Sequence, residues 1–181
     1  LLPLAPATML CNTITNGDPM SDKIISPFFG RHNHAHCTQE ALEQAELSCT
    51  DKGLKLTTLR KEVLAIVWQT HKPVGAYDVL EKLRTRGHKP SPPTAYRALD
   101  FLVEARLIHR LESLNSYIGC PAPDEHHQGQ FLICTQCRGV AEIEDLRIVK
   151  AIDATAASIG FNANRQTIEI TGLCDACESQ T

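Results

Sequence analysis

The chain has 181 residues, 43% of them hydrophobic, and a formal net charge of −3, which suits one domain or two small ones. No apolar run reaches the ~18 residues that a membrane-spanning helix requires, so we expect no such helix. The charge is unevenly distributed, because residues 51–118 carry twelve Lys and Arg against seven Asp and Glu, whereas residues 119–181 carry four against nine. A basic segment beside an acidic one indicates a polyanion-binding module attached to a second unit.

The first segment, residues 1–37, contains Pro, Asn and Ser without hydrophobic periodicity, and we expect a disordered leader. No basic region precedes its opening apolar stretch, which argues against a secretion signal, and Met20 is a candidate initiator. We therefore expect a cytoplasmic protein. A tract of potential metal ligands ends the leader, and we favour incidental ligands over a metal site there. The tract consists of His32, His34, His36 and Cys37.

Apolar residues at helical spacing predict four helices in the next part of the chain. The helices are expected at residues 38–50 with Thr38 as the N-cap, after Thr57 to about residue 70, at 76–86, and from 91–94 onward. Two short extended runs follow, at residues 107–112 and 117–118, with a bend at 113–116 between them. This pattern predicts a β-hairpin. Compact helices followed by a hairpin indicate a winged helix-turn-helix, a DNA-binding fold.

The fourth helix is the predicted recognition helix, and three of its residues are candidate DNA contacts. Arg97 can form a bidentate pair with guanine O6 and N7 or bind a phosphate. Tyr96 can contact a thymine methyl group or donate to a phosphate, and Thr94 lies at the helix N-terminus, where phosphates bind. The alternative is that Tyr96 packs half-buried and Arg97 is a plain surface charge.

Four of the eight cysteines form two C-x-x-C pairs, Cys134 with Cys137 and Cys174 with Cys177. Each such turn brings two thiolates to one side of a tight loop, and two turns complete a tetrahedral site for Zn²⁺. A redox dithiol or two disulfides are the alternatives, but a redox pair usually occurs once in a chain. The spacing therefore predicts a structural zinc site.

Taken in order, residues 92–100, the hairpin end at 115–120 and the two cysteine pairs resemble the ferric uptake regulator family, and within it the zinc uptake regulator branch. The resemblance covers about residues 38–178. It implies an α+β fold and a homodimer with a winged-helix domain (38–119), a hinge (120–130) and a small α/β dimerisation domain (131–181). The expected elements of this last domain are strands at 131–133, 140–143 and 167–171 and a helix at about 144–158.

The resemblance also implies a regulatory metal site made of His109, Cys120, His127 and Glu142, and hence about two Zn²⁺ per subunit. One thiolate, two imidazoles and one carboxylate suit zinc better than Fe²⁺ or Mn²⁺. Two ligand positions have alternatives. His126 competes with His127, and Glu144 or Asp145 could replace Glu142.

We therefore expect a zinc-sensing repressor of zinc-uptake genes, in which zinc fixes the dimer for binding to a palindromic DNA operator. An iron, manganese or peroxide sensor on the same scaffold is the main alternative, and a zinc-ribbon module would leave the basic winged helix without a role. We expect no enzymatic activity, although Cys120 and His127 could be read as a nucleophile and a base. Glu81 and Arg84 form an i, i+3 pair or contact a second dimer on the operator, and their spacing favours the former.

Overall fold

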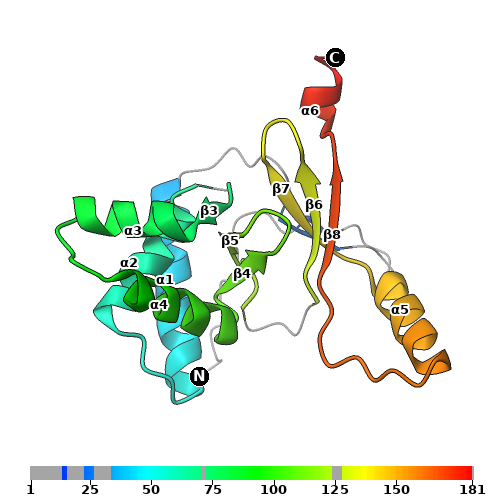
Figure 1. Cartoon of the computed structure of the whole chain (residues 1–181), viewed down its shortest axis with the longest axis horizontal. Coiled ribbons are helices and arrows are strands. Elements are labelled where there is room, and N and C mark those ends of the chain that lie inside the picture. The colour runs from blue at the N-terminus through cyan, green and yellow to red at the C-terminus, as the bar shows by residue number, and fades with distance from the viewer. Residues whose placement is uncertain (1–13, 16–22, 27–33, 71, 124–127, 181) are drawn as a thin grey trace, which may run out of the picture.

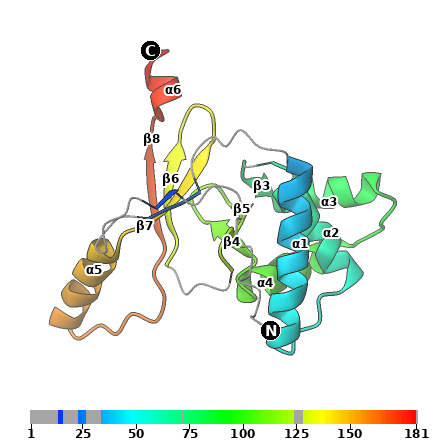
Figure 2. The same ribbon diagram turned by 180° about the vertical axis from the view of Figure 1, so that it is seen from behind.

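The computed structural model describes residues 14–15, 23–26, 34–70, 72–123 and 128–180. Two regions lie side by side in Figure 1 and, seen from behind, in Figure 2: a cluster of helices with a small sheet, and a larger sheet with α5 beside it and α6 at its end. This mixture of helices and sheets confirms the predicted α+β class. None of the described helices is long and apolar enough to cross a membrane.

The helical region, which we call the head, contains α1 (His34–Asp51), α2 (Thr58–Trp68), β3 (Val74–Gly75), α3 (Ala76–Thr85), α4 (Pro92–Glu104), β4 (Ile108–Leu111) and β5 (Ser116–Gly119). The second region contains β6 (Gln130–Cys134), β7 (Val140–Glu144), α5 (Leu146–Ser158), β8 (Ile168–Gly172) and α6 (Asp175–Glu178). Two further strands, β1 (Ile14–Thr15) and β2 (Lys23–Ser26), join the sheet of the second region.

The apolar faces of α1 to α4 pack together and form the core of the head. Local signals position these helices. The Thr57 side chain caps α2 by accepting from the N–H of Arg60, and α4 begins with proline, whose fixed φ suits a first turn. Strands β4 and β5 form an antiparallel hairpin, the wing, and β3 pairs with the other side of β5. The predicted winged helix-turn-helix is therefore present.

Helix α1 differs from the prediction at its start. It begins at His34, four residues before the predicted N-cap Thr38. The Thr38 hydroxyl is 3.4 Å from the carbonyl oxygen of Trp68, the last residue of α2, and donates to it, so this side chain joins α1 to the end of α2. Cys37 is buried in the core of the head, and this burial favours extending the helix through residue 37.

The expected disordered leader is also corrected in part. Residues 23–26 form β2, which pairs antiparallel with β7 through Ile24 opposite Ile143 and Ser26 opposite Glu142. Ile25 is buried at 1% exposure, which offsets part of the entropy of ordering the strand. Two consecutive isoleucines were the local signal for this strand, and they were too short a run to show periodicity.

The large sheet has the strand order β1-β2-β7-β6-β8. Strands β6 and β7 are antiparallel and joined by a turn, whereas β6 and β8 are parallel, so the chain crosses over through α5. Strands β6, β7 and β8 and helix α5 match the predicted elements within two residues at each end, whereas α6 was not predicted. Strand β8 is an edge strand, and its outer side pairs with no other described strand.

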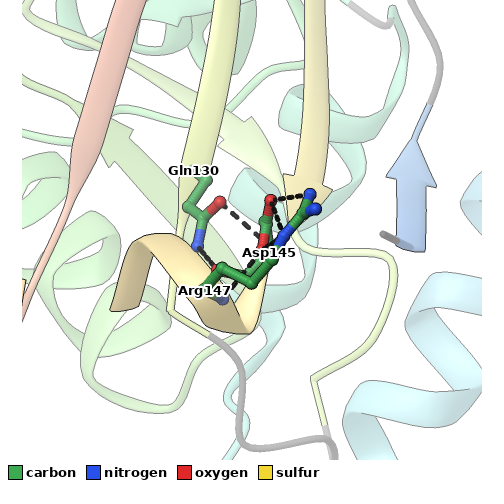
Figure 3. A network of polar contacts seen from close by, with 3 residues as sticks. All are labelled: Gln130, Asp145 and Arg147. Atoms are coloured by element: carbon green, nitrogen blue, oxygen red, sulfur yellow. Dashed lines mark hydrogen bonds and ion pairs between the residues drawn. The ribbon is translucent and has the colours of Figure 1, made fainter. Parts of the chain in front are cut away.

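A polar network fixes the start of α5, as Figure 3 shows. The buried side-chain amide of Gln130 donates to the Asp145 carbonyl oxygen (3.0 Å) and accepts from the Asp145 N–H (3.2 Å). The Asp145 carboxylate in turn accepts from the N–H of Arg147 and pairs with its guanidinium at 2.6 Å. Because Asp145 acts as the N-cap, α5 starts at Leu146 and not at the predicted residue 144.

The wing packs directly on the large sheet. Leu111 of the wing belongs to one buried cluster with Phe131, Ile133 and Val140 of β6 and β7, and the partly buried Leu114 and Ile118 lie against it. The two regions are thus held together by apolar contacts at the wing, which brings wing residues close to the strands that carry the predicted metal ligands.

Candidate metal centres and nucleic-acid surface

The four paired cysteines form one cluster at one end of the large sheet. Because β6 and β8 are parallel and Cys134 lies opposite Gly172, the turns that follow both strands emerge at the same end. The four sulfur atoms all lie within 4.8 Å of one another, and the Sγ atoms of Cys137 and Cys174 are 3.8 Å apart. The structure therefore brings together all four residues predicted for the structural metal site.

The electrostatics of this cluster favour a bound cation. Backbone N–H groups of Cys137 and Cys174 lower the pKa of the Cys134 thiol to about 6, whereas burial raises the pKa of Cys177 to about 12. Four thiolates at this spacing repel one another, and a divalent ion between the sulfurs would remove that repulsion. The N–H of Gly139 lies 3.4 Å from Cys137 Sγ and donates to it, and Arg138 adopts the left-handed conformation (φ 61°) that the turn requires. The donor set fits Zn²⁺.

A second candidate centre lies where the wing meets the sheet. The Nε2 atom of His109, in β4, is 3.1 Å from Oε1 of Glu142, in β7, and both side chains are largely buried. The His109 ring also packs edge-on against Phe131, with the ring centroids 5.1 Å apart. Two of the four residues predicted for the regulatory site, one from each region, are thus in contact.

Of the other two predicted ligands, only Cys120 lies within the described residues. Cys120 is buried just after β5, and it does not belong to the four-cysteine cluster, the group of three or more metal-ligand residues that the described part of the chain brings together. His127 and its competitor His126 lie outside the described residues.

The structure separates the three carboxylates considered for this site. Glu142 contacts His109, whereas Asp145 is committed to capping α5 and pairing with Arg147, and Glu144 lies opposite Lys23 of β2. Glu142 is therefore the carboxylate best placed to share a cation with the wing.

The histidine tract of the leader shows no common site in its described part. His36 is exposed and its Nε2 atom lies 3.1 Å from Glu40 Oε1, whereas Cys37 is buried in the core of the head. The two side chains therefore face different environments. The side chains of His32 and His34 lie outside the described residues.

The exposed face of α4 carries the predicted DNA contacts. Thr94, Tyr96 and Arg97 are exposed, with Tyr96 at 40%, whereas Ala95 and Ala98 of the same helix are buried. An exposed arginine and tyrosine on one helix face, in a winged-helix fold, are suited to contacts with bases and phosphates.

Sequence reasoning assigned no role to Glu169. Its carboxylate, in β8, accepts hydrogen bonds from two backbone N–H groups at the tip of the wing, those of Glu112 (2.7 Å) and Ser113 (3.0 Å). The partners are more than fifty positions apart in the sequence, so no local pattern could connect them. The one signal is a charged residue between Ile168 and Ile170 in a strand.

Comparison with known proteins gives a consistent set of similarities. Residues 51–171 match the model of the ferric uptake regulator family. The chain is 40% identical to the zinc uptake regulation protein of Escherichia coli strain K12 over 141 residues, which cover 77% of this chain and 82% of that protein. The fold matches a solved zinc uptake regulator complexed with zinc and DNA with a TM-score of 0.76, at 39% identity, covering 79% of this chain and 96% of the other. It also matches holo XcZur with a TM-score of 0.72, at 38% identity, covering 77% and 98%.

Proposed function

The chain belongs to the ferric uptake regulator family, and from this premise we propose that it is a zinc-sensing, DNA-binding transcriptional repressor of zinc-uptake genes in the cytoplasm. The observation that carries the sensing role is the contact between His109 of the wing and Glu142 of the large sheet. A cation held by these two side chains would join the head to the second region and so fix the direction in which α4 points. The similarity to zinc uptake regulators supports zinc as the cation.

Two zinc ions per subunit follow from the two donor sets. Cys134, Cys137, Cys174 and Cys177 would hold a structural zinc that ties the end of β8 to the β6–β7 turn. His109 and Glu142, together with Cys120 and His127, would hold the regulatory zinc. Zinc supplies a positive charge at this second site, and binding there is favoured only in arrangements that bring the ligands together.

The DNA-binding surface is assigned to α4, with Arg97 and Tyr96 reading bases and Thr94 positioned for a phosphate. A homodimer would present two such helices to successive major grooves of a palindromic operator. The domain limits that go with this role are a winged-helix domain at 38–119, a hinge at 120–130 and a dimerisation domain at 131–181. Glu81 and Arg84 are exposed on α3, where a second dimer on the same operator could reach them.

The dimer interface is assigned to the outer side of β8 and to α5. Helix α5 has an apolar stripe but no buried residue in the single chain, and Ile152 in it and Ile170 in β8 are exposed at 37% and 49%. An exposed edge strand beside an uncovered amphipathic helix is an arrangement that a second copy would complete.

The test is operator binding by the purified protein while free zinc is buffered over a wide range and bound zinc is counted. We expect each chain to hold one zinc tightly at all zinc concentrations, and operator binding to begin when each chain takes up a second zinc. His109→Ala should abolish the zinc dependence and keep the first zinc, whereas Cys49→Ala, which removes a cysteine outside both donor sets, should behave as wild type. Binding that follows Fe²⁺ or Mn²⁺ and ignores zinc would show an iron or manganese sensor instead.

The variant Cys120→Ser distinguishes a zinc sensor from an iron or manganese sensor. A serine hydroxyl is a poor zinc ligand in place of a thiolate, so the variant should need far more zinc for operator binding. If this variant keeps the wild-type metal preference and operator affinity, the assignment of zinc to the regulatory site is contradicted.

A further inference from the structure

The tip of the wing forms hydrogen bonds with a carboxylate of the large sheet. Glu169 is the second residue of β8, and its two carboxylate oxygens each accept one backbone N–H, Oε1 from Glu112 at 2.7 Å and Oε2 from Ser113 at 3.0 Å. Two short hydrogen bonds to one ionised acceptor are stronger and more directional than two bonds between neutral groups.

The wing exposes these two N–H groups because of its own geometry. The β4–β5 ladder ends at Leu111 opposite Ser116, so residues 112 and 113 lie beyond the last strand pair. The turn is closed by a hydrogen bond from the N–H of Asn115 to the carbonyl oxygen of Glu112, with Asn115 in the left-handed conformation (φ 45°). Glu169 therefore binds donors that the hairpin itself leaves outside its ladder.

Strand β8 aims this carboxylate at the wing by alternation. Side chains on a strand point to opposite faces in turn, so Glu169 faces away from its neighbours Ile168 and Ile170. In the parallel register Glu169 lies opposite Phe131, a residue of the apolar cluster on which the wing packs. Burial tends to raise the pKa of Glu169, but hydrogen bonds from Ser113 and Glu112 outweigh that effect and lower it, so the carboxylate is ionised at neutral pH.

We propose that Glu169 is a positioning residue, a latch that fixes the wing tip on β8 and thereby sets the orientation of the head for DNA. The latch acts at the turn of the hairpin, away from the His109–Glu142 contact within the strands, and it uses no metal ligand. Strand β8 would then serve both wing positioning and dimerisation, because Glu169 lies on one face of the strand and its outer edge is the proposed contact with a second copy. This inference rests on the proposed function.

The experiment compares full-length, zinc-loaded wild type with Glu169→Ala and Glu169→Gln. Glu112→Ala is the matched control, because it removes a carboxylate at the same contact while keeping the backbone N–H that Glu169 binds. Amide hydrogen exchange of residues 112 and 113 is measured by NMR, operator affinity is measured at saturating zinc, and zinc content is counted.

In Glu169→Ala we expect the two amides to exchange about tenfold faster or more, because their partner is lost. Operator affinity should fall about fivefold to tenfold, with zinc content unchanged. Glu169→Gln, which keeps the side-chain volume and one acceptor oxygen, should lie between wild type and Ala, and it serves where the Ala variant fails to fold. Glu112→Ala should leave the exchange of the Ser113 amide and the operator affinity near wild type.

Unchanged amide exchange in both Glu169 variants would overturn the latch, because the contact would then not protect the wing. Faster exchange with unchanged operator affinity would overturn its positioning role. A wild-type protein that binds no operator with any metal would instead contradict the proposed function, and the exchange measurement would still decide whether the contact exists.

Discussion

Single carboxylates in this chain act over very different distances along the sequence. Asp145 accepts the N–H of Arg147, two residues away, and so caps α5, a role that sequence patterns can indicate. Glu169 accepts N–H groups more than fifty residues away, and Glu142 reaches the wing histidine His109 in the same manner. At the residue scale, local partners are predictable because spacing fixes them, whereas distant partners depend on the packing of the two regions.

The contact of Glu169 with the wing tip makes the free energy of unfolding depend on pH. The pKa of Glu169 is lowered from its ordinary value of 4.5 in the folded protein, so the folded state binds the proton less readily than the unfolded state. Its contribution to stability is therefore complete above pH 4.5 and is lost as the pH falls through the lower, folded pKa. The free energy of unfolding of wild type minus that of Glu169→Gln should be largest at neutral pH and shrink below pH 4.5, as measured by urea unfolding. A difference that does not change with pH would contradict the lowered pKa.

At the scale of elements, the helices of the head follow from periodic apolar residues, and their ends follow from short-range signals such as Thr57 and the prolines before Thr94. Helix α1 is the exception, because burial of Cys37 and the bond from Thr38 to the Trp68 carbonyl move its start. Both are tertiary contacts, which local sequence patterns do not indicate. The wing strands were predicted from two short extended runs with a bend between them, but their contact with the large sheet was not predicted.

The end of β5 has no room for a side chain at Gly119. A Cβ atom there would come within 2.4–2.8 Å of the indole of Trp68, a buried residue of the head core. Gly119→Ala should therefore destabilise the protein by ~1–3 kcal/mol, because overpacking forces the strand or the indole to shift. Urea unfolding followed by the fluorescence of Trp68, the single tryptophan of the chain, measures the change. The control is Gly172→Ala, where a Cβ would meet no atom within 4 Å, and a similar loss in both variants would contradict the packing argument.

Helix α4 carries the proposed DNA contacts. Arg97→Ala should weaken operator binding by ~1–3 kcal/mol, because an exposed arginine on α4 would lose its contact with a base or phosphate while the helix keeps its buried face. Lys150→Ala removes an exposed positive charge from α5, in the other region, and should leave operator affinity near wild type. Operator titrations at saturating zinc give both values. Equal operator affinity of Arg97→Ala and wild type would contradict the assignment of the DNA-binding surface to α4.

At the scale of the whole molecule, β8 and α5 form the most exposed apolar part of the described second region. Apolar side chains of these elements and of the loop after α5 are exposed, among them Leu146, Ile152, Ile159, Phe161 and Ile170. The head, in contrast, has a closed core of its own. Assembly is therefore expected through the second region, which leaves the two heads free to face DNA.

Replacing Ile170 by Asp should separate such a dimer. A charge buried in an interface without a partner costs ~3 kcal/mol or more, which corresponds to a rise in the dimer dissociation constant of about 100-fold. Analytical ultracentrifugation measures the constant, and an unchanged content of the first zinc shows that the cysteine cluster is intact. Leu47→Asp, at an exposed apolar position of α1 in the head, is the control and should remain dimeric. A dimer that survives Ile170→Asp would place the interface elsewhere.

Residue spacing in the sequence predicted the winged helix, the two cysteine pairs and the exposed face of α4, because each depends on spacing over a few residues or on one repeated turn, and the family resemblance predicted the α+β class. The tertiary structure decided which of Glu142, Glu144 and Asp145 meets His109, how residues 23–26 join the sheet, and that Glu169 holds the wing tip. These contacts join segments that lie far apart in the chain. Their geometry is set by strand register and by the packing of the wing on the large sheet, and no local pattern of residues encodes either.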